Sequence, residues 1–256
     1  MNTFLAHQFL GATSRQLETE TFKVSVVDYT HRVSEEWHWH ERVHISSILR
    51  GGNLESRKRE DIQVAPGKVM VYDQGEVHRN RFTAHPSRNL NIELGEDFFG
   101  PDIEFAHLRL DESTQLEFHR IYFELALNDT QAAESICRQL QALFWKDPYR
   151  RGGEWVARLE TLLQDRWDEF PSLEELSREL GVHPITISKY FAKHKGMTLS
   201  EYLRKLKVKR ALQALLNTTE SAAEIAFGCG FSDQSHMTRL VKAYTGYTPG
   251  AIRSLV

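Results

Sequence analysis

The chain has 256 residues, of which 41% are hydrophobic, 11% aromatic and 26% charged, and its formal net charge is −3. This composition, without biased or repetitive tracts, is typical of folded globular proteins and excludes a disordered or collagen-like chain. No apolar run approaches 18 residues, and residues 1–11 lack a basic start and an apolar leader, so we expect a cytoplasmic protein without membrane-spanning segments. Cys137 and Cys229 fit no disulfide or thiolate-metal pattern and are interpreted as small buried hydrophobic residues.

Short strands are predicted between about residues 21 and 93. Apolar and polar residues alternate, or β-branched residues dominate, in the segments 21–27, 43–49 and 68–72. Turn residues such as Gly51-Gly52 and Pro66-Gly67 separate these segments. Regular spacing of this kind favours a β-sandwich or barrel. The charged run Arg57-Lys58-Arg59 is interpreted as the solvated edge of a hairpin.

Four histidines in this region are candidate ligands for a metal ion or an organic molecule. His38, His40 and His44 share the parity that places side chains on one face of a strand, and His78 belongs to a later strand. Neutral imidazoles that converge inside a barrel can bind zinc, nickel, copper or iron. Two alternatives are that they line an organic-ligand pocket, or that they lie exposed near a strand end without a special role. Glu93 alternates with apolar neighbours and could also face the interior.

From about residue 113 the apolar spacing becomes helical. Apolar residues such as Ile136 and Leu140, and later Leu159 and Leu163, recur on single helical faces. We expect these helices to pack on the barrel or on a second subunit. The ring of Pro171 disfavours a helical residue before it, so a domain boundary is predicted there. The predicted domains are a sensor over 1–110, a helical linker and dimerisation region over 111–171, and a helical domain over 172–256.

The last predicted domain contains an internal repeat. Ser172-x-x-Glu175 and Ser221-x-x-Glu224 are capping boxes 49 residues apart. Each precedes a glycine turn and a second helix, which is the pattern of a helix-turn-helix unit. Residues 172–256 hold 12 Lys and Arg against 7 Asp and Glu, whereas residues 1–171 hold 20 against 28. A basic segment on an acidic body suits a module that docks on phosphates.

The second helix of each copy is the candidate recognition helix. His183-Pro184 is predicted to open the first of these helices, and Ser232 to cap the second. One apolar face of each helix is expected to anchor it in the core, which leaves the opposite face for DNA. The expected anchors are Ile187, Phe191, Met237, Leu240 and Val241. Gln and Arg can pair with base edges, and Lys more often holds phosphates. The candidate DNA-binding residues are Thr186, Lys189, Lys193, Gln234, Ser235, Arg239 and Lys242.

The segment from residue 172 to residue 254 resembles the DNA-binding domain of AraC/XylS-type transcription regulators. The resemblance rests on the run IAFGCGFSDQSH at residues 225–236, on Gly246-Tyr-Thr-Pro249 and on Arg253. It implies a bacterial, dimeric regulator that binds promoter or operator DNA and works with RNA polymerase. We expect an activator, although the sequence alone leaves repression open. Met237 and Ile252 depart from the aromatic residue and tyrosine that are usual there, and neither change removes an expected DNA contact.

Residues 1–110 resemble a cupin barrel. The resemblance rests on two motifs. The first is His38-x-His40 followed by His44 and Gly51, and the second is the segment from Gly67 to His78. They imply one divalent transition metal, zinc, nickel or iron, bound by His38, His40, His44 and His78, although His44 stands where cupins usually have glutamate. The expected fold is thus α+β, with a cupin-like barrel, a helical linker and two helix-turn-helix motifs.

The function expected from both resemblances is regulation of transcription by sequence-specific DNA binding, modulated by a small molecule or metal in the sensor domain. The alternative is a cupin metalloenzyme fused to a DNA-binding domain. A third interpretation is an architectural DNA-binding protein without an effector. We expect no enzyme activity, because no acid-base pair is evident near the histidines.

Overall fold

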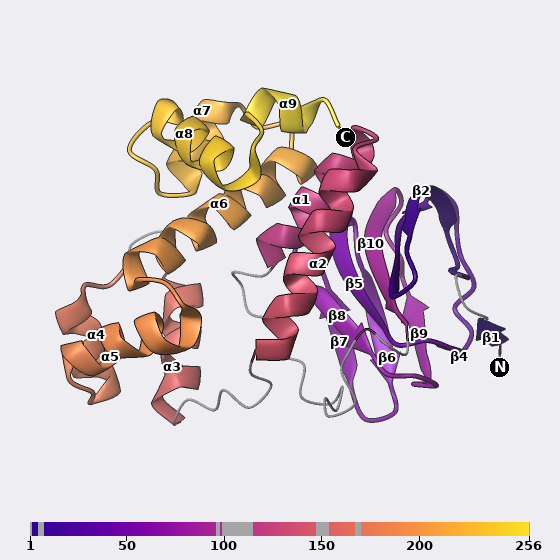
Figure 1. The fold of residues 1–256 in the computed structure, drawn as a ribbon, viewed down its shortest axis with the longest axis horizontal. Helices are drawn as coiled ribbons and strands as arrows, with labels where there is room; N and C mark the ends of the chain where they lie inside the picture. The colour runs from indigo at the N-terminus through magenta and orange to yellow at the C-terminus, as the bar shows by residue number, and fades with distance from the viewer. Residues whose placement is uncertain are drawn as a thin grey trace. The chain divides into compact units, whose positions relative to one another are not determined.

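The computed structural model describes residues 2–4, 8–95, 98, 115–146, 154–166 and 170–255. The chain divides into two compact units, one over residues 1–148 and one over residues 149–254. In the described residues the first unit contains strands and two helices, and the second is helical (Figure 1). The predicted α+β class is therefore confirmed. Parts of the predicted sensor (1, 5–7, 96–97, 99–110) and linker (111–114, 147–153, 167–169) lie outside the described residues.

The strands of the first unit form two five-stranded sheets. One sheet has the order β1-β4-β9-β6-β7 and the other the order β2-β3-β10-β5-β8. Among the described residues no strand pairing joins the two sheets, so they form an open two-sheet structure instead of the closed barrel expected from the sequence. The strands are β1 (Asn2–Phe4), β2 (Ala12–Glu18), β3 (Phe22–Tyr29), β4 (His38–His40), β5 (His44–Arg50), β6 (Asn53–Arg57), β7 (Asp61–Val64), β8 (Val69–Tyr72), β9 (His78–Arg81) and β10 (Ser87–Leu94).

Strand β10 is the central strand of its sheet and has two differently used faces. It pairs antiparallel with β3 on one side and with β5 on the other. Successive side chains of a strand point to opposite faces. Asn89 and Asn91 face a polar cavity described below. Ile92 and Leu94 line a small apolar cavity with residues of the two following helices, namely Phe118, Cys137 and Leu140.

Helices α1 (Gln115–Ala126) and α2 (Thr130–Lys146) pack against each other and beside this sheet (Figure 1). Asn128 adopts a left-handed conformation between them (φ 61°). Asp129 then accepts a hydrogen bond from the backbone N–H of Ala132 at 2.9 Å, which caps the start of α2. The two helices thus bury the apolar face of the β10 sheet, as one of the two expected packings requires. Cys137 and Cys229 are free and buried.

The second unit begins with α3 (Glu154–Asp165), which shares a core with the first helix-turn-helix copy. Leu159 and Leu163 of α3 are fully buried against Leu176, Ile187 and Phe191. The other helices here are α4 (Leu173–Leu180), α5 (Pro184–Tyr190) and the short π-helix η2 (Phe191–Lys195). The division between the units, after residue 148, therefore leaves α3 with the helical domain.

The 19-residue helix α6 (Leu199–Asn217) runs through both copies of the repeat. Its Tyr202 and Leu206 belong to the core of the first copy. It also contacts α7 (Ala222–Gly228), α8 (Gln234–Thr245) and α9 (Pro249–Arg253), the helices of the second copy. None of the helices among the described residues is long and apolar enough to cross a membrane.

Both predicted capping boxes are confirmed. Ser172 Oγ accepts a hydrogen bond from the N–H of Glu175 at 3.2 Å, and Glu175 Oε2 accepts one from the N–H of Ser172 at 2.7 Å. Ser221 and Glu224 repeat both bonds at the same two distances. These reciprocal bonds satisfy N–H groups that have no partner within the helix. The two copies therefore begin by the same local chemistry.

Candidate nucleic-acid interface and effector pocket

The two candidate recognition helices, α5 and α8, start and anchor alike. His183 caps α5 by accepting from the N–H of Ile185, and Pro184 is the first helical residue, as predicted. The predicted cap of α8, Ser232, is wrong. Asp233 caps the helix instead, and its Oδ1 accepts from the N–H of His236 at 2.7 Å. The second copy has one more residue before its helix, which moves the cap to the next position.

The apolar buried residues of α8 match those of α5 and the following η2 when the caps are aligned. Ile187 and Phe191 are fully buried, as are Met237 and Val241 at the matching positions of α8. Gly196 then ends η2 and Gly246 ends α8, both in the left-handed conformation, with φ values of 66° and 85°. Leu240, also expected as an anchor, is only half-buried. The geometry confirms one structural unit built twice.

Every candidate DNA-binding side chain lies on the surface. Since the core residues occupy one helical face, the residues of the opposite face are open to solvent. The exposed residues are Thr186, Lys189 and Lys193 of the first copy and Gln234, Ser235, Arg239 and Lys242 of the second. Each copy therefore presents cationic and hydrogen-bonding side chains together, a combination suited to phosphates and base edges.

Several other cations of the second unit hold its own backbone. Arg210 donates to the carbonyl of Gln164 at 2.8 Å. Lys207 donates to the carbonyl of Gly230, and Arg253 to that of Glu220. Part of the positive charge counted in the sequence is thus structural, which the charge count could not reveal.

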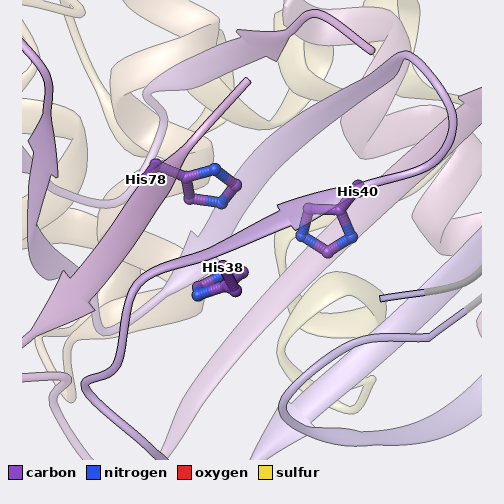
Figure 2. A group of neighbouring side chains, drawn as sticks. All are labelled: His38, His40 and His78. Carbon is purple, nitrogen blue, oxygen red and sulfur yellow. The ribbon is translucent and has the colours of Figure 1, made fainter. Parts of the chain in front are cut away.

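Three of the four candidate histidines form a compact group in the first unit. His38 and His40 come from β4, His78 comes from β9, and β4 pairs with β9 at His38 and His78. Their ligand atoms all lie within 4.8 Å of one another (Figure 2). All three side chains are buried. Three imidazoles at this spacing are a donor set that a transition metal accepts.

The hydrogen bonds of two of these rings indicate which ring nitrogen carries the proton. His38 Nδ1 bonds the carbonyl oxygen of Glu36 at 3.0 Å, and His78 Nδ1 bonds that of Glu76 at 3.0 Å. A carbonyl only accepts, so Nδ1 carries the proton and the lone pair lies on Nε2. Backbone carbonyls commonly orient metal-binding histidines in this way. The residues therefore fit a metal ion.

Burial keeps the rings neutral, which is the form that binds metals. Desolvation, with a smaller effect from the neighbouring His38, lowers the pKa of His40 to about 4 and that of His78 to about 3. Burial also lowers the pKa of His38. No proton therefore has to leave these rings for a metal to bind near neutral pH.

His44 lies beside this group on a different strand. The expectation that it shares a strand face with His38 and His40 is wrong, because residues 41–43 leave β4 and His44 begins β5 in the other sheet. Its ring stacks on Tyr72, with centroids 4.4 Å apart and planes at 10°. The His40 ring is 4.5 Å away. His44 thus lies between His40 of the histidine group and Tyr72 of the other sheet.

A polar cavity adjoins the histidines between the two sheets. Its empty volume is about 520 Å³, part of which is open to solvent. Apolar walls come from residues such as Phe9 and Ile48. The polar lining residues are His40, His44, His78, Tyr72, Ser46, Ser87, Thr83, Asn53, Asn80, Asn89 and Asn91.

Four polar side-chain atoms on this lining are buried without a hydrogen-bond partner among the described residues. They are His44 Nδ1, Asn53 Oδ1, Thr83 Oγ1 and Asn91 Nδ2. Unpaired buried polar atoms are rare and costly in folded proteins. The amide oxygen of Asn53 can accept a hydrogen bond from a polar ligand, the amide nitrogen of Asn91 can donate one, and the hydroxyl of Thr83 can do either. Glu93, the other predicted ligand residue, is buried opposite His44 on β10, two residues beyond Asn91.

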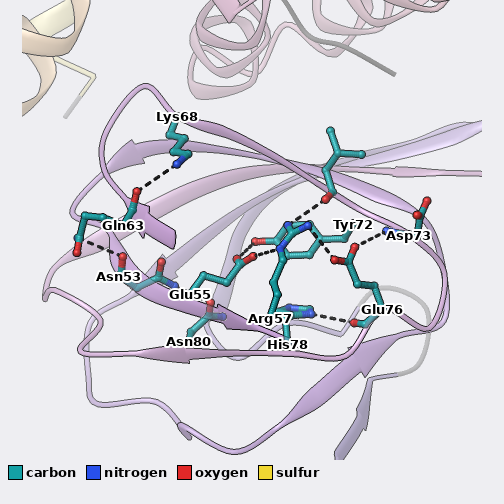
Figure 3. Close-up of polar contacts among 11 residues, drawn as sticks. Asn53, Glu55, Arg57, Gln63, Lys68, Tyr72, Asp73, Glu76, His78 and Asn80 are labelled. Atoms are coloured by element: carbon teal, nitrogen blue, oxygen red, sulfur yellow. Dashed lines mark hydrogen bonds and ion pairs between the residues drawn. The ribbon is translucent and has the colours of Figure 1, made fainter. Parts of the chain in front are cut away.

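A buried polar network forms the wall behind Tyr72 (Figure 3). The Tyr72 hydroxyl donates to Glu55, and Arg57 Nε donates to the other carboxylate oxygen of Glu55 at 2.6 Å. Arg57 also donates to Glu76 at 2.8 Å and to the Val71 carbonyl at 3.1 Å. Arg57 is therefore not a solvated edge residue, and that interpretation of the charged run was wrong for its first member. Lys58 and Arg59 are exposed.

The chain is similar in sequence to known helix-turn-helix proteins. Residues 176–254 match the family described as a helix-turn-helix domain. The HTH-type transcriptional activator RhaR of Mannheimia succiniciproducens is 23% identical over 239 residues, covering 85% of this chain and 86% of the relative. The HTH-type transcriptional activator RhaS of an Enterobacter species is 32% identical over 159 residues, 58% of this chain and 57% of the relative.

Solved structures include a transcriptional regulator from Chromobacterium violaceum with an AraC-type DNA-binding domain. It is 25% identical, covers 39% of this chain and 89% of its own, and has a TM-score of 0.38. The chain thus matches RhaR over most of its length, and RhaS over a little more than half of the latter. Residues 176–254 of the C-terminal unit thus form a domain of the helix-turn-helix family, and the chain as a whole is similar to HTH-type transcriptional activators.

Proposed function

We propose that the protein is a sequence-specific DNA-binding regulator of transcription whose activity depends on a ligand in its first unit. The observation that carries the DNA-binding part is the doubled helix-turn-helix unit with an exposed polar face on each recognition helix. The relatives named as transcriptional activators support an activating role at promoters. The family resemblance also supports a homodimer that works with RNA polymerase.

In the proposed binding mode, α5 and α8 enter successive major-groove openings on one side of the DNA. At about 1.5 Å per residue, the 19 residues of α6 span about 28 Å. Successive openings lie ~34 Å apart. Gln234 and Arg239 are suited to adenine and guanine edges, and Lys189, Lys193 and Lys242 to phosphates.

Selection of DNA by the full chain tests this part. The chain is incubated with a pool of duplexes of random sequence, and bound duplexes are amplified and sequenced over several rounds. We expect a motif with two parts about one helical turn apart. A variant with Gln234 and Arg239 both changed to Ala should lose one part, and Lys58→Ala, on the exposed edge of the first unit, should keep both. A pool without enrichment contradicts the proposal.

For the ligand, we propose that His38, His40 and His78 bind one zinc, nickel or iron ion, with His44 at the edge of the site. The support is their spacing, burial and neutral state. A bound ion would offer open positions for an oxygen or nitrogen donor of a second ligand. The protein's own residues supply the remaining contacts.

An organic ligand in the adjoining cavity is the second part of the sensor proposal. The unpaired atoms of Asn53, Thr83 and Asn91 favour an uncharged molecule with both donor and acceptor groups. Strand β10 carries Asn91 on this side and Ile92 against the helices on the other. Ligand binding would therefore change the packing of α1 and α2 on the sheet. We propose that this change in packing transmits the effect of the ligand to the rest of the protein.

Elemental analysis of the full chain, purified without chelator or histidine tag, tests the metal. We expect about one ion per chain, lost in the His38→Ala and His78→Ala variants. His31→Ala, an exposed histidine outside the group, is the matched control and should keep the ion. No ion in the wild type after incubation with zinc, nickel and iron would leave the organic ligand as the effector.

A sensing role is favoured over catalysis by the state of the buried carboxylate behind Tyr72. Glu55 is held by Tyr72 and Arg57, and so is not free to accept a proton from a substrate. Turnover of small polar substrates by the metal-loaded chain would support the metalloenzyme alternative instead.

A further inference from the structure

Ile185 is a large apolar side chain that lies open to solvent on the first recognition helix. It is 56% exposed, whereas Ile187, two residues later, is fully buried. At about 100° per residue, Ile185 lies about 160° from Ile187 around the helix and only about 40° from Lys189. Ile185 therefore lies on the face of α5 that carries the candidate DNA contacts.

The repeat assigns Ile185 a counterpart in the second copy. With the caps His183 and Asp233 aligned, each helix has its buried anchor four residues after the cap. Ile185 then matches Ser235, and Lys189 matches Arg239. Lys189, Arg239 and Ser235 are all exposed, as Ile185 is. One copy thus presents an apolar group where the other presents a hydroxyl.

We infer that Ile185 contacts the C5-methyl group of a thymine in the major groove, and so makes the first helix-turn-helix unit selective for thymine at one position. The inference rests on the proposed DNA-binding function. In the major groove the thymine methyl is the apolar group among base-edge donors and acceptors. An isoleucine has no hydrogen-bonding group for any other base feature, and its β-branched side chain loses little rotational freedom on contact.

The neighbouring charges identify the occupant as DNA. Thr186 and Lys189 of α5 and Lys193 of η2 are exposed, as Ile185 is. Lysines beside an apolar group suit a surface that lies between phosphates and base edges. A surface that binds an apolar protein partner would present several apolar side chains together. Ile185 instead has polar sequence neighbours at 183, 186, 188 and 189.

The test removes the methyl group alone. A duplex selected by the full chain is synthesised with each thymine replaced in turn by deoxyuridine, and binding is measured by fluorescence anisotropy. We expect wild-type affinity to fall about fourfold at one position, the effect of one buried methyl group. Ile185→Ala and Ile185→Ser, the residue of the second copy, should bind the thymine and uracil duplexes equally.

Phe227→Ala is the matched control, since Phe227 is an apolar side chain on α7 with 88% exposure. It should keep the wild-type preference for thymine. The inference fails if the selected motif has no thymine, if no uracil substitution weakens wild-type binding, or if the Ile185 variants keep the preference. Thermal unfolding confirms that each variant is folded. A full chain that selects no DNA sequence overturns the proposed function itself, which separates the two failures.

Discussion

Tyr72 donates its hydroxyl hydrogen to the carboxylate of Glu55 inside the first unit, and the same tyrosine ring stacks on His44. Glu55 is fully buried, and Arg57 is its second partner. Burial and the neighbouring Glu55 raise the pKa of Tyr72 well above its ordinary value, so the hydroxyl remains a donor. The wall of the cavity next to the histidines is therefore fixed by a buried polar bond.

Tyr72→Phe should destabilise the first unit. The ring and its stacking on His44 remain, but one buried oxygen of Glu55 loses its donor, which costs about 1–3 kcal/mol in the free energy of unfolding. Urea unfolding followed by circular dichroism measures the change. Tyr244→Phe, a half-exposed tyrosine on α8, is the control and should change stability little. Equal stability of Tyr72→Phe and wild type would show that the bond contributes nothing net.

The histidine group predicts that the metal-free protein loses stability in acid. In the folded state the pKa of His40 is about 4 and that of His78 about 3, and both rise toward the ordinary 6.5 on unfolding. Between these values the unfolded chain binds more protons, so the free energy of unfolding increases with pH. The contribution is complete above pH 6.5 and is lost as the pH falls toward 4 and 3.

Urea titrations in the presence of a chelator at pH 7 and pH 5 measure this effect. Each of the two histidines should account for a loss on the order of 2 kcal/mol. His78→Asn should flatten the dependence on pH, and His31→Asn, at an exposed position, should not. An unchanged slope in His78→Asn would mean that other groups cause the loss.

The cap of α8 gives a test within the DNA-binding unit. Asp233 Oδ1 accepts from the N–H of His236, whereas the hydroxyl of Ser232 bonds, within the described part of the chain, the side chains of Asp233 and His236. Asp233→Ala should therefore lower the melting temperature of the second unit more than Ser232→Ala does. Differential scanning calorimetry of both variants decides the matter. A larger effect of Ser232→Ala would restore the cap predicted from the sequence.

The parts of the fold that were predictable are those encoded over a few residues. A capping box needs only Ser172 and Glu175, and the exposed face of α8 follows from helical periodicity around Met237. The cap of α8 was misplaced by one residue because Ser232 and Asp233 are both good caps and the two copies differ by one residue there. The local sequence alone does not decide which of two adjacent capping residues begins the helix.

The parts that were missed depend on contacts between distant strands. Strand parity holds only within one strand, so the turn at residues 41–43 moved His44 to the other sheet while leaving it near His40. The bond between Glu55 and Tyr72 joins strands of different sheets. A charged run around Arg57 is typical of solvated hairpins, but Glu55, two residues earlier on the same strand face, is a local signal that its first member pairs with a glutamate. That this glutamate is buried depends on the other sheet.

Arg239 and Lys193 should contribute to DNA binding in different ways. Arg239 is exposed on α8 and can bond two acceptors of a guanine, so Arg239→Ala should weaken binding and relax the preference at one base pair by ~1–3 kcal/mol. Lys193→Ala should weaken binding to all sequences alike and reduce the slope of log affinity against log salt by about 1, because it removes one phosphate contact. Anisotropy titrations at several salt concentrations, on the selected duplex and its single-base variants, separate the two effects. Lys58→Ala is the control for charge alone. If Arg239→Ala changes the salt slope but no base preference, Arg239 contacts the backbone of the DNA and Gln234 becomes the remaining candidate for base recognition by α8.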